Sequence, residues 1–149
     1  NFVTRKITAA VACIKNGKKI GVPLNEVGDP IVQNGKLKLG DLDVKRDWGY
    51  APEYAEAMWL MLQKDKPDDF VVSTGEAHSV KEFVQEAFSV VGLNWEDYVV
   101  TDSKFIPPVQ TGTLRGDSTK AKDILGWEPK IKFKDIVRIM LHADLAKFY

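Results

Sequence analysis

The sequence has few of the residues that most often build a self-contained catalytic centre. Its 149 residues include one cysteine, Cys13, and two histidines, His78 and His142. A single cysteine excludes an internal disulfide, and so few thiol and imidazole groups argue against a zinc site and against a Ser-His-Asp triad. We therefore expect no metal site in this chain.

Two motifs of nicotinamide-dependent enzymes are also missing. No G-x-G-x-x-G run is present, so the chain lacks the glycine-rich turn whose backbone amides meet a pyrophosphate. No tyrosine is followed four residues later by a lysine, which is the catalytic pair of many dehydrogenases. We expect neither a catalytic residue nor a cofactor-binding residue in this chain.

The chain also lacks an excess of charge and a long apolar run. Twenty-one basic residues balance twenty-one acidic ones. This balance argues against a nucleic-acid partner, because nucleic-acid-binding proteins usually carry a basic excess. No apolar run approaches the roughly 18 residues of a membrane span, so we expect no membrane association. The single cysteine and the lack of a leader-like segment favour a cytoplasmic protein.

What is present is an ordinary composition for a globular protein, with 44% hydrophobic and 28% charged residues. A chain of this length fits one domain or a piece of a larger one. The sequence begins at Asn1 rather than at a methionine, and a helical pattern starts two residues later. We therefore expect it to be the rear part of a longer protein.

Apolar periodicity predicts a mixed α/β chain, mainly helices with a few short strands. Helical spacing is found at residues 3–14, 52–64, 80–91, 118–125 and 133–148. Short apolar runs predict strands at 70–73 and 99–100. Asn34-Gly35 predicts a tight hairpin turn before the alternating segment 37–39.

One stretch places two cations at a strand-to-helix junction. Lys45 and Arg46 follow a strand-like segment, and Trp48 comes directly after Asp47. Ligand groups of α/β proteins commonly lie in the loop after a strand, and a guanidinium binds phosphate bidentately. The alternative is a local ion pair of Arg46 with Asp47 or another acid. Trp48 is more typical of a core residue than of a ligand stack.

Other polar residues have structural explanations when each is taken singly. Lys6, on the first expected helix, is most simply a solvated surface residue. His78 comes just before the capping box formed by Ser79 and Glu82, and is expected to order that turn. Cys13 lies among alanines, as a small core residue does.

Several longer motifs together carry a resemblance that covers nearly the whole chain apart from about residues 16–36. They are NFVTRKI, KRDWGYAPEYAEAMWLML, KPDDFVVSTGEAHSVKEF, LNWEDYVV and GDSTKAKDILGWEPK. In this order they resemble the C-terminal part of GDP-mannose 4,6-dehydratases, which are sugar-nucleotide enzymes of the extended short-chain dehydrogenase/reductase group. The resemblance implies that residues 1–149 are the C-terminal, sugar-nucleotide-binding region of a Rossmann-type fold.

The resemblance implies an enzyme of two parts. An N-terminal Rossmann domain, absent from this chain, binds NADP and carries the catalytic Thr, Glu and Tyr-x-x-x-Lys. The C-terminal region grips the GDP of the substrate, which the family converts from GDP-mannose to GDP-4-keto-6-deoxymannose. The full-length protein is expected to be a homo-oligomer, and this chain alone is expected to be inactive.

The resemblance also implies the residues that contact the substrate. Val3 and Lys6 match positions near the guanosine end and its phosphates, and Arg46 matches an arginine that contacts the diphosphate. Farther along, Pro107 stands where the family has a second arginine. Gln110 stands where the family has a glutamate, and its amide oxygen can still accept a hydrogen bond from a ribose hydroxyl.

Two departures from the family pattern suggest a diverged member whose sugar nucleotide differs from GDP-mannose. One is the loss of charge at Pro107 and Gln110. The other is the segment 16–36, which we expect to be an inserted loop or hairpin. The same departures leave two alternatives open, a non-catalytic module that binds sugar nucleotides or a protein, and a structural remnant that binds nothing.

Overall fold

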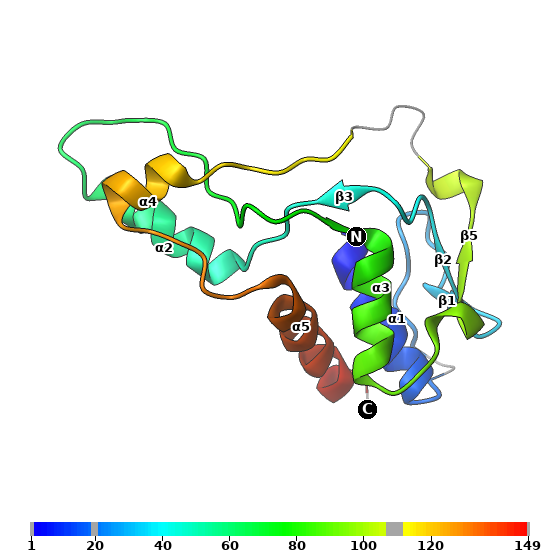
Figure 1. The fold of residues 1–149 in the computed structure, drawn as a ribbon. Helices are drawn as coiled ribbons and strands as arrows, with labels where there is room; N and C mark the ends of the chain where they lie inside the picture. Colours follow the sequence, from blue (N-terminus) through cyan, green and yellow to red (C-terminus); the bar gives the residue numbers. More distant parts are fainter. Residues whose placement is uncertain (1, 19–20, 107–111, 149) are drawn as a thin grey trace. The chain divides into compact units, whose positions relative to one another are not determined.

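A computed structural model describes residues 2–18, 21–106 and 112–148. The helices in these ranges are α1 (Val3–Lys15), α2 (Ala51–Leu62), α3 (Val80–Val90), α4 (Thr119–Leu125) and α5 (Phe133–Lys147), with short 3-10 turns η1 (Trp95–Asp97) and η2 (Ser103–Phe105) (Figure 1). The strands are β1 (Val32–Gln33), β2 (Lys36–Leu39), β3 (Lys45–Arg46), β4 (His78–Ser79) and β5 (Val99–Thr101). This mixed α/β chain of helices and short strands confirms the fold class expected from the sequence.

The strands form two small sheets. One has the order β1-β2-β5, and the other pairs β3 with β4. Strand β1 runs antiparallel to β2, with Val32 opposite Leu37. Strand β5 runs parallel to β2, with Leu37 opposite Val99. Because side chains alternate along a strand, Leu37 and Leu39 both face inward and are buried.

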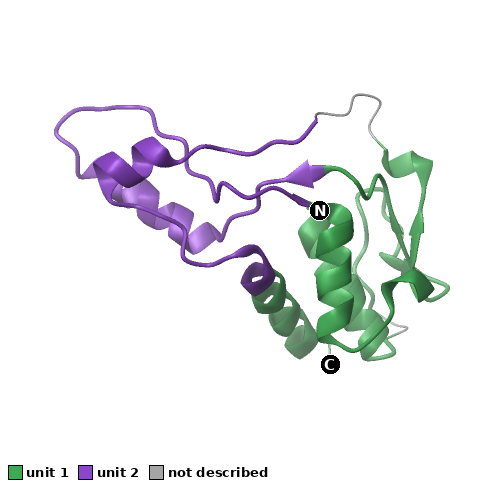
Figure 2. Cartoon of the chain, viewed as in Figure 1, with its two compact units in different colours: residues 1–44, 79–110, 137–149 green, residues 45–78, 111–136 purple. Residues whose placement is uncertain are grey.

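The chain divides into two compact units, shown in different colours in Figure 2. Unit 1 comprises Asn1–Val44, Ser79–Gln110 and Val137–Tyr149, and unit 2 comprises Lys45–His78 and Thr111–Ile136. In unit 1, α1 and α3 pack side by side (Figure 1). The fully buried apolar residues of this unit include Ile7, Val11, Leu37, Phe83, Val84, Phe88, Val137 and Leu141.

The hairpin of unit 1 turns where the sequence predicts. Asn34 and Gly35 adopt φ values of 51° and 73°, which is the left-handed backbone that a two-residue hairpin turn requires. Farther back in the segment 16–36, Leu24 and Pro30 form an isolated antiparallel bridge. That this segment is an insertion stays a prediction.

Helix boundaries follow the local signals. The hydroxyl of Ser79 accepts from the Glu82 amide at 3.1 Å, and the Glu82 carboxylate accepts from the Ser79 amide at 2.6 Å, so the expected capping box opens α3. Asp117 accepts from the Thr119 amide at 2.9 Å at the start of α4. Gly126 ends α4 in the left-handed conformation with φ 69°.

Unit 2 is built around a small cluster between α2 and α4. Ala57, Ala121 and Trp127 are buried there, and the Tyr54 ring meets Trp127 edge-on at 5.8 Å between centroids. The indole N–H of Trp127 donates to the Glu53 carbonyl at 2.9 Å. Pro52 lies in the first turn of α2, as the sequence predicts.

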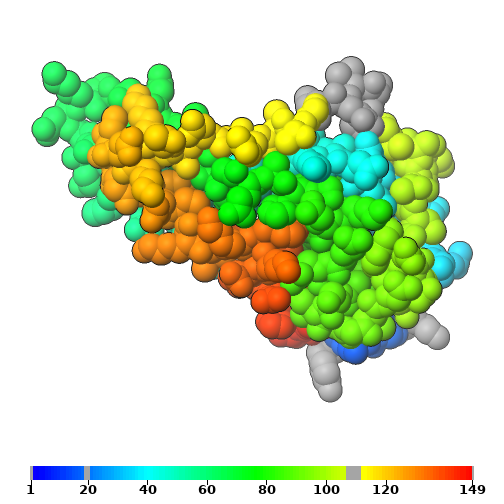
Figure 3. Space-filling view, in the orientation of Figure 1, coloured from blue at the N-terminus to red at the C-terminus, as the bar shows by residue number. Residues whose placement is uncertain are grey.

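The expected strand at 70–73 is wrong. The structure assigns no strand there, although the chain is not helical and Ser73 is buried. A strand is defined by a hydrogen-bonded neighbour, and no strand of the described residues pairs with this segment. The preceding segment 63–69 is exposed along its length (Figure 3). Among the described helices, none has the length and apolar character needed to cross a membrane.

Candidate functional site

The first candidate residue, Lys6, lies on α1 and is buried. Its residue is 6% exposed, so the expectation of a solvated surface lysine is wrong. The Nζ atom lies 3.9 Å from the centroid of the Phe105 ring and 3.5 Å from Oε1 of Glu26. Val3 precedes Lys6 by about one helical turn and is half-buried. The two residues of unit 1 implied by the resemblance therefore share one end of α1.

A cavity of about 240 Å³ opens beside the Lys6 ammonium in unit 1. Its lining combines polar residues with apolar ones: the polar residues are Lys6, Asn25, Asp29, Gln33, Lys38, Asp102 and Lys104, and the apolar ones are Val27, Pro30, Ile31 and Phe105. Three of these residues are cationic and two are anionic. Such a lining suits a small polar ligand that carries negative charge.

Arg46 ends β3 in unit 2 and is half-buried. Its Nη1 atom donates to the carbonyl of Lys45 at 2.7 Å and to the carbonyl of Gly112 at 3.3 Å. Both contacts hold the guanidinium through one nitrogen. Arg46 is described with unit 2, whereas Val3 and Lys6 belong to unit 1.

Asp47, which the sequence suggested only as an ion-pair partner, organises unit 2. Its Oδ1 accepts from the Thr74 amide at 2.9 Å and also from the Thr74 hydroxyl. Its Oδ2 accepts from the amides of Gly75 at 2.9 Å and Gly116 at 3.2 Å. In the sequence, the short segments Thr74-Gly75 and Arg115-Gly116-Asp117 are the only sign of these two loops. Neither segment indicates which acid accepts hydrogen bonds from its amides.

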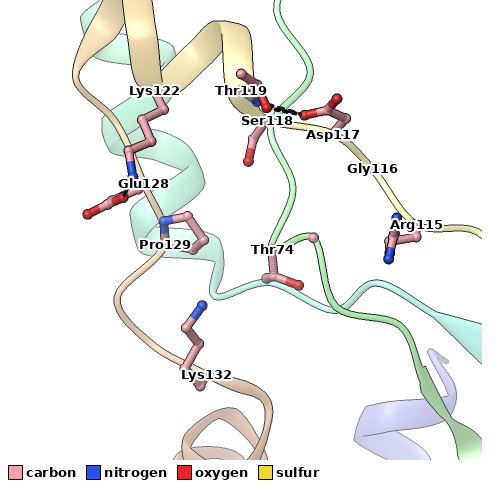
Figure 4. A pocket seen from close by; sticks show the side chains of 11 residues that line it. Thr74, Arg115, Gly116, Asp117, Ser118, Thr119, Lys122, Glu128, Pro129 and Lys132 are labelled. Carbon is pink, nitrogen blue, oxygen red and sulfur yellow. Dashed lines mark hydrogen bonds and ion pairs between the residues drawn. The ribbon is translucent and has the colours of Figure 1, made fainter.

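The loops that Asp47 holds line an open cleft of about 560 Å³ within unit 2 (Figure 4). Arg115, Lys122 and Lys132 bring positive charge to it, and Figure 4 shows Lys132 extending toward Pro129 and Thr74. Lys122 pairs with Glu128 at 2.7 Å, and Lys132 lies 3.3 Å from Glu76. Each of these lysines therefore already has an acidic partner.

The acids around the cleft are held in their charged forms. The pKa of Asp117 is lowered first by the hydrogen bond from the Thr119 hydroxyl and then by the Thr119 amide. The Lys122 side chain lowers the pKa of Glu128, and Glu128 raises the pKa of Lys122 in return. These shifts describe a surface ion pair and a capped turn, so none of them indicates an acid-base catalyst.

The aromatic residues near this region pack against each other. The Trp48 ring stacks on Phe133 with centroids 5.9 Å apart, and the His78 ring stacks on Phe133 at 3.9 Å. The Nε2 atom of His78 lies 3.6 Å from Glu76. Trp48 thus has the packing role that the sequence favoured, and the His78 ring lies against a buried phenylalanine.

Three further expectations concern Cys13, a metal site and the pair Pro107 and Gln110. Cys13 is buried, as predicted, and burial raises the pKa of its thiol. Among the described residues, no group of three or more His, Cys, Asp or Glu side chains is placed to hold a metal ion. Pro107 and Gln110 lie outside the described residues, so the role of Gln110 stays a prediction.

Comparison with known proteins gives one consistent family. The family model described as GDP-mannose 4,6 dehydratase matches residues 1–140. GDP-mannose 4,6 dehydratase 1 of Arabidopsis thaliana is 48% identical over 145 residues, which are 97% of this chain and 36% of that protein. The Homo sapiens GDP-mannose 4,6 dehydratase is 43% identical over 162 residues, covering 97% of this chain and 40% of that protein. The chain thus spans 35–42% of the length of the curated relatives it matches.

Solved structures share the fold. RMD from Pseudomonas aeruginosa, solved with NADPH, matches with a TM-score of 0.79 at 20% identity, over 98% of this chain and 43% of that one. UDP-glucose 4-epimerase from Thermotoga maritima, solved with UDP-glucose, matches with a TM-score of 0.70 at 18% identity, over 94% of this chain and 39% of that one. At these identities the likeness shows the fold alone, which is that of part of a Rossmann-type extended short-chain dehydrogenase.

Proposed function

The chain belongs to the GDP-mannose 4,6-dehydratase family, and from this premise we propose that it is the substrate-binding portion of a GDP-sugar 4,6-dehydratase. Such a lyase removes water from the sugar in a reaction that includes an internal oxidation and reduction. The observation that carries the proposal is the match over 97% of the chain at up to 48% identity. We expect the reaction to take place in the cytoplasm, because a chain with a single cysteine forms no internal disulfide and so suits a reducing compartment.

The described helices of this chain do not begin with the turn that an NADP site needs. A dinucleotide needs a glycine-rich turn that opens directly into a helix. The residues at the N-caps of α1 to α4 are Phe2, Tyr50, Ser79 and Ser118, and none of them is a glycine. We therefore assign NADP, and the catalytic residues, to the part of the protein that lies outside this chain.

We assign the substrate grip to Val3, Lys6, Arg46 and Gln110. Lys6 supports this role because it is buried and lines a cavity with polar and apolar walls, where its interaction with an anion is stronger than in water. Arg46 supports it because a guanidinium binds a phosphate bidentately, and Arg46 ends β3 just before a loop, where ligand groups of α/β proteins commonly lie. A diphosphate is the anion that such a cation suits best.

Exposed apolar side chains of unit 2 support the proposal that a further domain or subunit packs against it. On α2, Met58 and Trp59 are each 60% exposed and Leu62 is 82% exposed, and Val71 of the segment 70–73 is 54% exposed. Met58, Trp59 and Leu62 lie within about one turn of α2, and large apolar side chains exposed close together often mark an interaction surface. We propose that the remaining part of the protein, or its other subunits in a homo-oligomer, covers this face and pairs with 70–73.

The grip is tested by titrating the full-length protein with GDP and with UDP in a calorimeter. We expect Arg46→Ala to weaken binding of the preferred nucleotide by roughly 10-fold or more, because a charge-assisted phosphate contact contributes about 1.5–3 kcal/mol. Lys45→Ala, which removes the neighbouring exposed cation, is the matched control and should change affinity much less. An unchanged affinity in Arg46→Ala would mean that Arg46 is structural.

The enzymatic reading is tested by the coding sequence before Asn1. A glycine fingerprint and a Tyr-x-x-x-Lys motif there, or in a partner subunit, are expected. If neither is found, the alternative of a non-catalytic sugar-nucleotide or protein-binding module replaces the enzyme. Failure of the full-length protein to bind either nucleotide would overturn the enzyme and the sugar-nucleotide-binding module alike, and would leave the protein-binding module.

A further inference from the structure

The Lys6 ammonium already has an anionic partner, and that partner comes from the segment expected to be an insertion. Oε1 of Glu26 accepts from Nζ of Lys6 at 3.5 Å. The Lys6 side chain is 5% exposed, whereas that of Glu26 is 43% exposed. The pair therefore joins a buried cation to an acid that reaches it from the solvent side.

The surroundings of Lys6 leave a phosphate few directions of approach. The Phe105 ring lies 3.9 Å from Nζ and covers one side of the ammonium. Glu26 pairs with Nζ at 3.5 Å, and Lys6 also lines the 240 Å³ cavity. Among the described residues, Glu26 is the acid that pairs with Lys6, so an incoming anion competes with its carboxylate for the ammonium.

Glu26 is held by a folded loop rather than by a freely moving one. The side-chain oxygen of Asn25 accepts from the amides of Val27 at 3.0 Å and Asp29 at 2.9 Å. The Asn25 amide donates to the Asp29 carbonyl at 2.7 Å, and Gly28 turns the chain with φ 85°. These hydrogen bonds close the loop on both sides of Glu26 and hold its backbone beside Lys6.

We propose that Glu26 is a specificity-determining residue of the nucleotide grip: it competes with the ligand's phosphates for the Lys6 ammonium and lowers the affinity for nucleoside diphosphates. This inference rests on the proposed function, because it takes Lys6 as a phosphate contact. A diphosphate either displaces the Glu26 carboxylate or binds beside it, and like charges at such a distance repel each other. Glu26 repels a ligand less strongly when that ligand carries less negative charge beside Lys6.

The test measures GDP affinity of the full-length protein by calorimetry in four variants beside the unchanged protein. Glu26→Gln removes the competing charge and keeps the shape of the side chain. Glu96→Gln makes the same change in net charge, but on the exposed turn η1, away from this pair. Lys6→Met and the double variant Lys6→Met/Glu26→Gln complete a cycle that isolates the coupling between the two residues.

We expect Glu26→Gln to tighten GDP binding by about 3- to 10-fold, Glu96→Gln to leave it unchanged, and the gain to vanish when Lys6 is replaced. A GDP affinity that Glu26→Gln leaves unchanged or weakens would overturn the inference while the proposed function stands. A gain that persists in the Lys6→Met background would also overturn it, since the effect would not act through Lys6. Absence of GDP binding in every form would overturn the proposed function and the inference with it.

Discussion

Oδ2 of Asp47 accepts a hydrogen bond from the amide of Gly116 at 3.2 Å, across 69 positions of sequence. The same carboxylate accepts from the amides of Thr74 and Gly75 at 2.9 Å each. One side chain thus joins three separate segments of unit 2, and two of them line the cleft of Figure 4. In the stretch Lys45-Arg46-Asp47-Trp48, the acid shapes the loops while the arginine is the proposed ligand contact.

Replacing Asp47 should destabilise unit 2. In Asp47→Ala, three backbone amides lose a charged acceptor, and we expect a loss of about 2–4 kcal/mol in the free energy of unfolding. Urea unfolding followed by tryptophan fluorescence measures it. Asp41→Ala is the matched control, because within the described residues the half-buried Asp41 accepts from the Asp43 amide alone, at 2.8 Å. A similar small change in both variants would show that the Asp47 contacts carry little stability.

A second prediction concerns two glycines of unit 2, Gly116, which lines the same cleft, and Gly112. A Cβ on Gly116 would overlap the side chain of Ser73, lying 2.5 Å from its Oγ, whereas a Cβ on Gly112 would meet nothing within 4 Å. Ser73 is buried and cannot easily move aside. Gly116→Ala should therefore cost about 1–3 kcal/mol by overpacking, and Gly112→Ala should be close to neutral.

Thermal and urea unfolding of these two variants, compared with the unchanged protein, check this difference. Neither glycine has a positive φ, so backbone strain does not contribute to the comparison. Equal stability of the two variants would mean that the approach of the chain at Gly116 to Ser73 is not tight in solution.

Local signals in the sequence predicted local structure well. Asn34-Gly35 specifies a turn because both residues tolerate positive φ, and Ser79 with Glu82 caps α3 because the two bonds form within four residues. The apolar spacing predicted α1 correctly for the same reason, since the pattern depends on residues three or four apart. None of these features depends on the rest of the fold.

Features that depend on distant segments were missed or wrong. Lys6 is buried because Phe105, about a hundred residues later, lies over its ammonium, and no local pattern shows that. Asp47 is next to Arg46 in sequence, but its partners are reached only through the fold. The segment 70–73 has strand-like residues, yet a strand also needs a neighbour, and the described part of the chain provides none.

A third prediction concerns a buried acid between two helices of unit 1. Asp144 on α5 is fully buried, accepts from the Thr8 hydroxyl at 2.7 Å and forms an ion pair with Arg5. Asp144→Ala should lower the free energy of unfolding by about 2–3 kcal/mol. The cost stays below that of breaking a wholly buried pair, because the Arg5 side chain is 41% exposed and can be hydrated.

Urea unfolding checks this third prediction, with His142→Ala on an exposed position of the same helix as the control. We expect the control to change stability by no more than about 0.5 kcal/mol. If both variants behave alike, the contacts of Asp144 with α1 do not stabilise the packing of the two helices.

The last prediction is a pH dependence that comes from Tyr54. Burial raises the pKa of its phenol above the ordinary value of 10.0, and the nearby charges of Asp47 and Glu53 raise it further. The folded protein therefore holds this proton more tightly than the unfolded chain does. The resulting stability is fully present below about pH 10 and is lost as the pH rises through the folded pKa.

Tyr54→Phe keeps the ring against Trp127 and removes the titrating group. Urea unfolding of both proteins between about pH 8 and pH 11 should show a constant difference in stability at the lower end. Above about pH 10 the unchanged protein should lose stability faster than Tyr54→Phe, because its unfolded state gains the ionised phenol first. Parallel curves over the whole range would mean that Tyr54 ionises equally easily in both states, and that neither burial nor Asp47 acts on its hydroxyl.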